Sequence, residues 1–366
     1  MMTKKQMVKK VFPGGNTTKG FYSYFHYIIE EDANRFFILK GGPGVGKSSF
    51  MKEIGRKMVE KGYSIEEHYC SSANGALDGV VIPDLKVAII DGTAPHMVDP
   101  KNPGAVDEIL NLGEYWKQEN MEQHKEEIIA VNKETGKTFA RTYKYLKALD
   151  AIIEDITVIY QEGMDLHKYY QVQESLLNEV FQNKSFQRKV GKERHLFGSS
   201  ITPEGVVDYL ETVVGPMETI YYIKGNWGTG WSELLKEVVK KSIVLGYDVE
   251  IYHTPFAPEM IEDIVISELN LAFTTNDKFA DQCTHKIDLD ELINEDILKK
   301  YQAALEFDKK MYQQLLEKAI YYINKAKLTH DQLENFYIEN MDFDRINEKR
   351  AETIERILKY EKSNFS

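Results

Sequence analysis

Apolar and polar residues follow two recurring patterns along this chain. An apolar run at 36–40 predicts a buried strand, and it leads into the glycine-rich stretch 41–46. Over 50–58, apolar residues recur at the spacing of one helix face. Segments 64–70 and 86–91 predict two further strands. Because strands that alternate with helices are joined by right-handed crossovers, we predict a largely parallel, buried sheet.

Two long segments, 105–182 and 290–362, are rich in Glu, Lys, Gln, Tyr and Leu and poor in glycine and proline. This composition predicts helices, and we interpret their many tyrosines as packing residues. Their heptads are irregular, so we expect helical hairpins packed on the sheet or on each other rather than a coiled-coil arm. A shorter helical entry is expected ahead of the first strand.

The whole plan occurs twice in the chain. Residues 223–247 align with 39–63 without a gap, at a shift of 184 (225 − 41), and 197–210 match 12–25. Self-similarity of this kind indicates repeated structural units. We therefore predict a tandem duplication, with one domain over 1–185 and a second over 186–366. Each domain includes its long helical region.

The first copy carries the pattern G-x-x-x-x-G-K-[ST] at 41–48, between the predicted strand and helix. In this context the pattern predicts a phosphate-binding (Walker A) loop, and an unliganded glycine-rich turn is the alternative. Lys47 is expected to reach the β- and γ-phosphates of a nucleotide and the Ser48 hydroxyl to ligate Mg²⁺. Nucleotide contacts are expected from Gly42, Gly44, Val45, Gly46, Lys47, Ser48 and Ser49.

A second nucleotide motif follows at 87–92, where an apolar strand ends in Asp91. We expect Asp91 to hold Mg²⁺ directly or through water, while an ordinary acidic strand end is the alternative. Copy two has Trp231 in place of Lys47 and Thr275 in place of Asp91. An indole supplies no cation for the phosphates, so copy two is predicted to be degenerate and non-catalytic.

These motifs resemble those of the P-loop NTPase superfamily, and the whole chain resembles a bacterial family with two tandem P-loop domains, labelled ATPase or nucleotide kinase. The resemblance implies an α/β fold, a tandem duplication of a P-loop domain with a mostly parallel sheet flanked by helices. It also implies ATP and Mg²⁺ as the cofactors. ATP is preferred over GTP because the chain lacks an Asn-Lys-x-Asp guanine motif.

Other residues near the motifs are weaker candidates. His96 and Asp99 follow the Asp91 strand and are candidate substrate contacts, with His96 also a candidate acid–base. The same H-x-[VI]-D pattern recurs at 285–288 in the degenerate copy, which favours a structural role. The basic bridge 183–195 offers Arg188 or Arg194 as an arginine finger, and a solvated linker is the alternative.

Composition narrows the function classes. The chain has 366 residues, a net charge of −12 and a pI near 5.4, which argues against a broad nucleic-acid-binding face. Two cysteines without C-x-x-C spacing fit a reducing cytosol, and no apolar run suits a membrane span or signal peptide. Three functions remain: a Mg²⁺-dependent ATPase, a small-molecule or nucleotide kinase with its acceptor near 91–108, and a non-catalytic nucleotide-sensing scaffold. The sequence does not identify the general base, the phosphate acceptor or any further small-molecule or protein partner.

Overall fold

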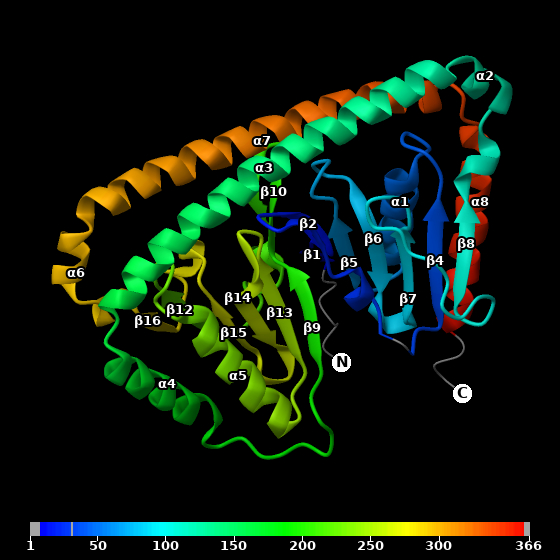
Figure 1. The fold of residues 1–366 in the computed structure, drawn as a ribbon. Helices are drawn as coiled ribbons and strands as arrows, with labels where there is room; N and C mark the ends of the chain where they lie inside the picture. Colours follow the sequence, from blue (N-terminus) through cyan, green and yellow to red (C-terminus); the bar gives the residue numbers. More distant parts are fainter. Residues whose placement is uncertain (1–7, 31, 362–366) are drawn as a thin grey trace.

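The structure is a computed structural model that describes residues 8–30 and 32–361. It contains two similar six-stranded sheets, which confirms the internal duplication (Figure 1). The first sheet has the order β1 (Val8–Val11), β5 (Ile65–Tyr69), β6 (Leu77–Ile82), β7 (Val87–Asp91), β4 (Arg35–Lys40) and β8 (Asp107–Asn111). The second has the corresponding order β9 (Glu193–Phe197), β13 (Val249–Thr254), β14 (Ala257–Ile266), β15 (Leu271–Thr274), β12 (Thr219–Lys224) and β16 (His285–Asp288).

The sheets are mixed, so the prediction of a mostly parallel sheet is only partly right. Strand β6 runs antiparallel to both β5 and β7, and β14 runs antiparallel to both β13 and β15. The cause is a short connection: the 3₁₀ turn η2 (Pro83–Leu85) and Lys86, with φ of 52°, reverse the chain between β6 and β7. A parallel connection needs a crossover of about a dozen residues or more, which this segment lacks.

The expected helical entry to each copy is wrong. Strand β1 is followed by a hairpin of β2 (Gly14–Thr17) and β3 (Gly20–Ser23) and by η1 (Phe25–Tyr27). Copy two repeats this with β10 (Ser199–Thr202), β11 (Gly205–Asp208) and η4 (Leu210–Thr212). Both hairpins turn at a glycine with positive φ, Gly20 at 99° and Gly205 at 120°. Strands of four residues are too short to show a clear period in the sequence.

Helix α1 (Lys47–Glu60) follows β4, and α5 (Trp231–Leu245) follows β12, as the alignment of the copies predicts. The predicted apolar face of α1 is confirmed, since Phe50, Met51, Ile54 and Met58 are fully buried. This face packs with β4, β6 and β7 in the first hydrophobic core.

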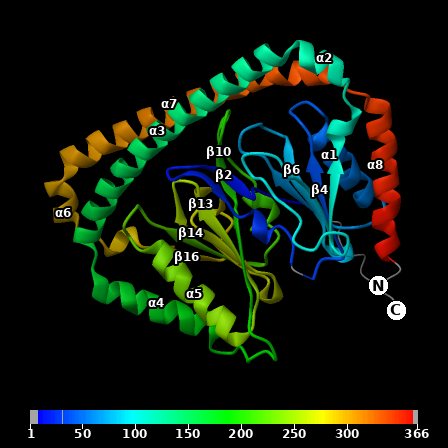
Figure 2. The same cartoon turned by 45° about the vertical axis from the view of Figure 1, so that its right-hand side comes forward.

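Long helices connect the two halves of the molecule. The remaining elements are η3 (Leu112–Tyr115), α2 (Gln118–Gln123), α3 (Lys125–Gly163), α4 (Leu166–Phe181), η5 (Ser267–Leu269), η6 (Asp277–Phe279), η7 (Asp290–Leu292), α6 (Glu295–Lys300), α7 (Gln302–Ile338) and α8 (Phe343–Leu358). Helices α3 and α7 lie side by side in opposite directions across both sheets (Figures 1 and 2). Leu146 and Leu149 of α3 pack with Leu316 and Ile323 of α7 between them. These helices pair across the two copies and do not form a hairpin within one copy.

Beyond this pair, each copy gives its last helix to the other copy. Helix α8, from the second half of the chain, packs on α1, with Ile346 and Ile357 in the first core. Helix α4, from the first half, packs on α5, with Leu176 and Val180 in the second core. Both views show α8 beside the first sheet and α4 beside the second (Figures 1 and 2). The predicted boundary near 185 separates repeats along the chain, whereas each folded half contains residues from both repeats.

The two places where one copy contacts the other before its last helix are related by the internal duplication. An antiparallel bridge joins Trp116 to Met341, and a second joins Met164 to Ile293. These pairs are related by one shift of 177 (293 − 116 and 341 − 164). The exchange is therefore reciprocal, and both halves depend on it for their cores.

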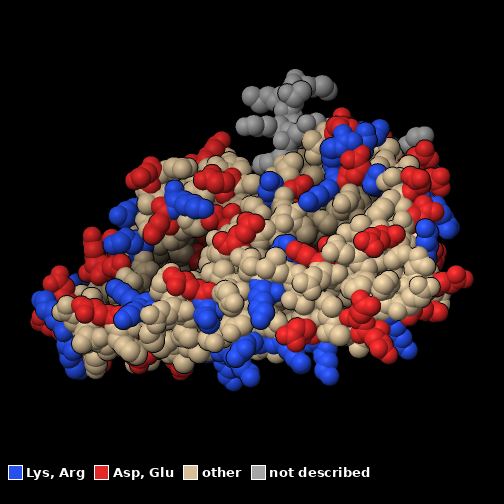
Figure 3. Space-filling view, turned by 90° about the horizontal axis from the view of Figure 1, so that it is seen from above, with Lys and Arg blue, Asp and Glu red and all other residues tan. Residues whose placement is uncertain are grey.

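On the face that carries α3 and α7, lysines and arginines are interspersed with aspartates and glutamates and form no single-sign stripe (Figure 3). Within the described part of the chain, no helix is both long and apolar enough to cross a membrane.

Candidate functional site

The first glycine loop, residues 41–48, joins the end of β4 to the start of α1. Gly44 and Gly46 have φ of 69° and 87°, a region that residues with a Cβ rarely adopt. Gly46 is the N-cap of α1, and no side chain caps the helix there. The first-turn N–H groups of α1 therefore lack a side-chain acceptor, which is the usual arrangement at an anion-binding helix N-terminus.

Lys47 and Asp91, both predicted as site residues, lie together. The Lys47 Nζ is 3.6 Å from Asp91 Oδ2 and donates hydrogen bonds to the carbonyls of Gly41 (3.0 Å) and Gly42 (2.8 Å). Strands β4 and β7 pair in parallel, which places Asp91 beside Leu39 at the end that feeds the glycine loop. The side chains of Lys47 and Asp91 are only 11% and 15% exposed. Partial burial strengthens the attraction between these two charges.

The other predicted loop residues differ in which of their atoms are available to a ligand. The Ser48 Oγ accepts a hydrogen bond from the N–H of Leu77 at 3.0 Å, and Ser232 makes the same bond to Ile261 in copy two at 2.9 Å. This bond therefore also anchors β6 to α1. Val45 is fully buried, so it offers a ligand only its backbone, and Ser49 is exposed.

Sequence reasoning missed Asp78, at the start of β6. Burial raises its pKa to about 6, with a contribution from the nearby Asp91 carboxylate, while His96 and Lys47 act in the opposite direction. A carboxyl group that titrates near neutral pH beside Lys47 is a candidate acid–base. The sequence does contain a signal for it, because Asp78 is an acidic residue inside the apolar segment 77–82. Since this segment was not predicted to be a strand, the burial of Asp78 was not expected. The corresponding residue of copy two, Glu262, also has a raised pKa, of about 7, mainly through burial.

His96 lies next to Asp78, with its Nε2 3.8 Å from Asp78 Oδ1. Its ring stacks on Phe25 at 4.4 Å, and both ring nitrogens are buried without a hydrogen bond to the described residues. Asp99 is different: its side chain is 89% exposed and lies 3.6 Å from the Nζ of Lys40. Of this predicted pair, only His96 belongs to the site.

The structure corrects the comparison of His96 with the second copy. His285 begins β16 and pairs with Tyr221 of β12, which is the place that Glu108 of β8 takes beside Phe37 in the first sheet. His96 instead lies in the loop between β7 and β8. The H-x-[VI]-D similarity is therefore not a structural correspondence and gives no evidence against a functional role for His96.

Neither predicted arginine contacts the first glycine loop. The Arg194 guanidinium binds Glu66 (2.6 Å) and Glu250 (3.1 Å) and donates to the carbonyls of Tyr27 and Ile28, at the junction of the two sheets. These bonds use its donors in a buried structural cluster. Arg188 is exposed in the bridge, whose neighbouring residues contact the carboxyl end of α5 and not its amino end.

The helix exchange brings other residues to the loop. A Cβ on Gly42 would collide with the Tyr337 ring, and one on Gly44 would lie 2.7 Å from the carbonyl oxygen of Glu334. The end of α7 therefore packs directly on the glycine loop. In the first turn of α8, the Phe343 ring would lie 3.5 Å from a Cβ on Gly46, and Arg345, two residues further on, lies 4.7 Å above the Tyr115 ring. Arg345 was missed because it lies about 300 residues from the loop in sequence.

The second glycine loop, residues 225–232, has a similar backbone, with Gly228 and Gly230 at φ of 89° and 87°, but it packs mainly against aromatic rings. The Trp231 ring is 6% exposed and packs against Trp227 at 5.1 Å. The Tyr169 hydroxyl donates to the carbonyl of Gly230 at 2.9 Å, and a Cβ on Gly228 would collide with the carbonyl of Thr157. An aromatic ring thus packs where the first copy has Lys47, and the Asp290 carboxylate accepts a hydrogen bond from the N–H of Asn226 in this loop at 2.9 Å.

Among the residues that the structure describes, no group of three or more His, Cys, Asp or Glu side chains is arranged to hold a metal ion. A divalent cation at the first glycine loop would need most of its ligands from phosphate and water, with the protein supplying the oxygens of Ser48 and Asp91.

Comparisons with protein-family models, with curated proteins and with solved structures give no match. The function of the site therefore has to be argued from its own geometry.

Proposed function

We propose that the first glycine loop binds the phosphates of ATP and that the protein is a Mg²⁺-dependent ATPase with one working site. One observation carries the proposal. The Lys47 Nζ and Asp91 Oδ2 atoms lie 3.6 Å apart beside a glycine loop that leads into the amino end of α1. A cation, an uncapped helix terminus and a carboxylate are the groups that a magnesium–phosphate ligand requires.

The donor set suits Mg²⁺. Ser48 offers a hydroxyl oxygen and Asp91 a carboxylate, both hard ligands, and Mg²⁺ characteristically takes its other ligands from phosphate and water. When bound, the ion would neutralise phosphate charge. In the nucleotide-bound state, the Lys47 amine would exchange its bonds to the Gly41 and Gly42 carbonyls for phosphate oxygens.

Asp78 and His96 supply a candidate for proton transfer. Asp78 has a pKa of about 6, so its carboxyl can hold or release a proton near neutral pH, and it lies 3.8 Å from the His96 ring. We assign them the orientation and deprotonation of the attacking water. Arg345, on the first turn of α8, is the arginine best placed to approach the developing phosphate charge.

The direct test measures nucleotide turnover by pure protein with Mg²⁺, following ADP and free phosphate separately. Equal release of both by the wild type, reduced at least about a hundredfold in Lys47→Ala, is expected for an ATPase. Lys52→Ala, which removes an exposed lysine one turn along the same helix, is the matched control and should leave turnover unchanged. ADP release that requires an added acceptor would identify a kinase instead.

The packing of α7 on the first glycine loop favours a second candidate function, a nucleotide sensor. Tyr337 and Glu334 of α7 pack on the glycine loop, and α7 pairs along its length with α3, whose end packs on the second loop. Nucleotide that displaces this cover would move a helix shared by both halves, which suits a nucleotide sensor. Tight ATP binding without turnover above background, together with altered hydrogen exchange in α3 and α7, would favour the sensor over the ATPase.

A further inference from the structure

A depression lies where the two copies meet, away from both glycine loops. One wall comes from β3 and η1 of the first copy and the other from β9, β13 and β14 of the second. The residues that matter for its chemistry are Tyr22, Tyr24, Tyr27, His195, His253 and Glu259. None of these belongs to the site described above.

The Tyr22 and Tyr27 rings of this depression are tilted against the buried Tyr24 ring, which itself stacks on His253 at 4.8 Å and on His195 at 5.9 Å. The rings of Tyr22 and Tyr27 make angles of 57° and 60° with the Tyr24 ring, at centroid distances of 5.2 and 6.2 Å. The Tyr27 ring makes an angle of 55° with that of His195. A flat heterocycle stacks best between near-parallel faces. A compact cation is attracted by the face of each ring whatever the angle between rings, so this shape favours a cation.

The charges around the depression favour the same ligand. Glu259 is exposed at its edge and forms no ion pair among the described residues, and the described lining contains no lysine or arginine. Burial disfavours the charged form of the three histidines in the lining, His26, His195 and His253. Burial lowers the pKa of His253 to about 3 and also lowers that of His195. The His253 ring lies with Nδ1 3.1 Å from the Met260 carbonyl and Nε2 2.9 Å from His195 Nδ1, and His195 Nε2 lies 3.2 Å from a carboxylate oxygen of Glu193.

We propose that this junction pocket binds a compact organic cation, an alkylated ammonium group, against the faces of Tyr22 and Tyr27 with Glu259 as its counter-ion. The inference is independent of nucleotide binding. It assigns a ligand class to a site that only the joined copies form, because the tyrosines come from the first copy and the carboxylate from the second.

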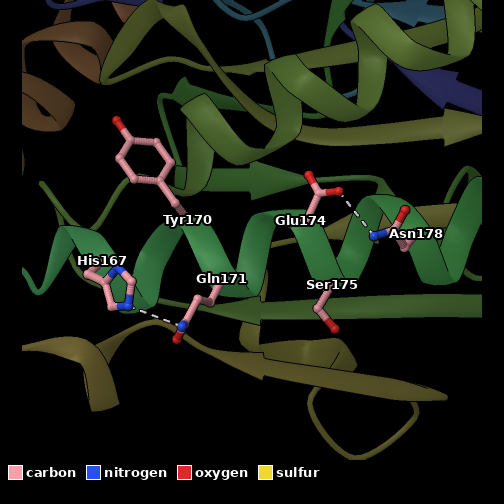
Figure 4. A pocket seen from close by; sticks show the side chains of 6 residues that line it. All are labelled: His167, Tyr170, Gln171, Glu174, Ser175 and Asn178. Carbon is pink, nitrogen blue, oxygen red and sulfur yellow. Dashed lines mark hydrogen bonds between the residues drawn. The ribbon is translucent and has the colours of Figure 1, made fainter.

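A second depression provides the contrast. It lies along one face of α4 and is lined by His167, Tyr170, Gln171, Glu174, Ser175 and Asn178 (Figure 4). It has a single tyrosine, and its Glu174 already accepts a hydrogen bond from Asn178 at 3.1 Å. One ring and one engaged carboxylate do not form a cage, so we expect no cation binding there.

The experiment titrates the full-length protein with choline and with its neutral isostere 3,3-dimethyl-1-butanol, at constant ionic strength, by NMR or calorimetry. We expect saturable choline binding and at least about tenfold weaker binding of the isostere, because only choline gains from the ring quadrupoles and the carboxylate. Tyr27→Leu should weaken choline binding about tenfold, while Tyr27→Phe, which keeps the ring, should stay within about twofold. Glu259→Gln, at an exposed position, should weaken it about threefold.

Tyr170→Leu and Glu174→Gln are the matched controls in the α4 depression and should leave choline binding unchanged. Circular dichroism and thermal unfolding establish that each variant is folded. The proposal is overturned if choline does not bind in the millimolar range, if the neutral isostere binds equally well, or if Tyr27→Leu and Glu259→Gln both bind like the wild type. Tighter binding of a flat heterocycle such as adenine than of choline would also overturn it.

Discussion

The two glycine loops have nearly the same backbone and opposite chemistry. Gly46 and Gly230 both have φ of 87° and ψ of 17°, and each caps a helix that follows a strand of corresponding position. The next residue is Lys47 in one copy and Trp231 in the other. Lys47 lies near a carboxylate, whereas Trp231 packs with Trp227 in a cluster that also includes Tyr169.

The comparison shows that the loop conformation does not depend on a phosphate-binding cation. Both loops are covered in the same way by the helix exchange: Glu334 contributes its carbonyl at Gly44, and Thr157, 177 positions earlier, does so at Gly228. Packing from the opposite copy therefore holds either loop in shape. The side chain that follows the last glycine decides whether the loop is suited to phosphate or to packing.

The largest expected effect comes from removing, in each loop, the side chain that follows the last glycine. Trp231→Ala removes a buried ring and should lower the free energy of unfolding by about 3–5 kcal/mol, with little change in nucleotide affinity. Lys47→Ala should do the reverse, with nucleotide binding or turnover reduced at least about a hundredfold and little change in stability. Urea unfolding and nucleotide titration of both variants check this. A Lys47→Ala variant that still binds ATP would break the comparison.

The reciprocal exchange of α4 and α8 predicts where a core mutation is felt. Ile357→Ala in α8 and Leu176→Ala in α4 should each destabilise the protein by about 2–5 kcal/mol, because both side chains are buried. Hydrogen exchange should rise first in β4 and α1 for Ile357→Ala, and in β12 and α5 for Leu176→Ala. Faster exchange in the opposite sheets would show that each copy keeps its own last helix.

The buried carboxyls Asp78 and Glu262 predict a pH effect in each copy. The pKa of Asp78 is about 6 in the folded protein and its ordinary value is 3.8, so ionisation disfavours folding by about 3 kcal/mol. The folded protein has its full stability below pH 3.8, where the Asp78 carboxyl is protonated in both states. That contribution to the free energy of unfolding is lost as the pH rises through about 6. Relative to the wild type, Asp78→Asn should therefore gain stability between about pH 4 and 7. Glu262→Gln should do so between its ordinary value of 4.5 and about 7.

Urea unfolding of both variants across pH 4–7.5 measures these differences. A stability difference that does not change with pH would show that the carboxyl in question keeps an ordinary pKa. With ATP and Mg²⁺ present, only the Asp78 profile should shift, because only the first copy is proposed to bind them.

The smallest expected effect concerns Arg345, in the first turn of α8. Arg345→Ala should lower ATP turnover about tenfold with little change in ATP affinity, because its charge is proposed to act in the transition state. The matched control is Lys168→Ala, at the corresponding position of α4 (345 − 168 = 177), which should leave turnover unchanged. An equal effect of both substitutions would mean that they act through stability, and measuring kcat and KM separately resolves this.

Local pattern was sufficient for the elements around the first glycine loop. The strand at 36–40, the buried face of α1 and the duplication are all visible in the sequence, because a strand or helix records its buried face in nearby residues. The meeting of Lys47 and Asp91 could be predicted for the same reason, since each ends or begins an element whose place in the sheet follows from the motif.

Only the tertiary structure decided which surfaces these elements share. The reversed strand β6, and with it Asp78, depends on a turn of a few residues that the strand–helix alternation does not show. The placement of α8, and with it Tyr337 and Arg345, depends on contacts between residues 230 to 295 positions apart (345 − 115 and 337 − 42). An amphipathic helix encodes that one face is buried but not against which partner. With two similar cores in one chain, the connection through α3 and α7 makes that choice.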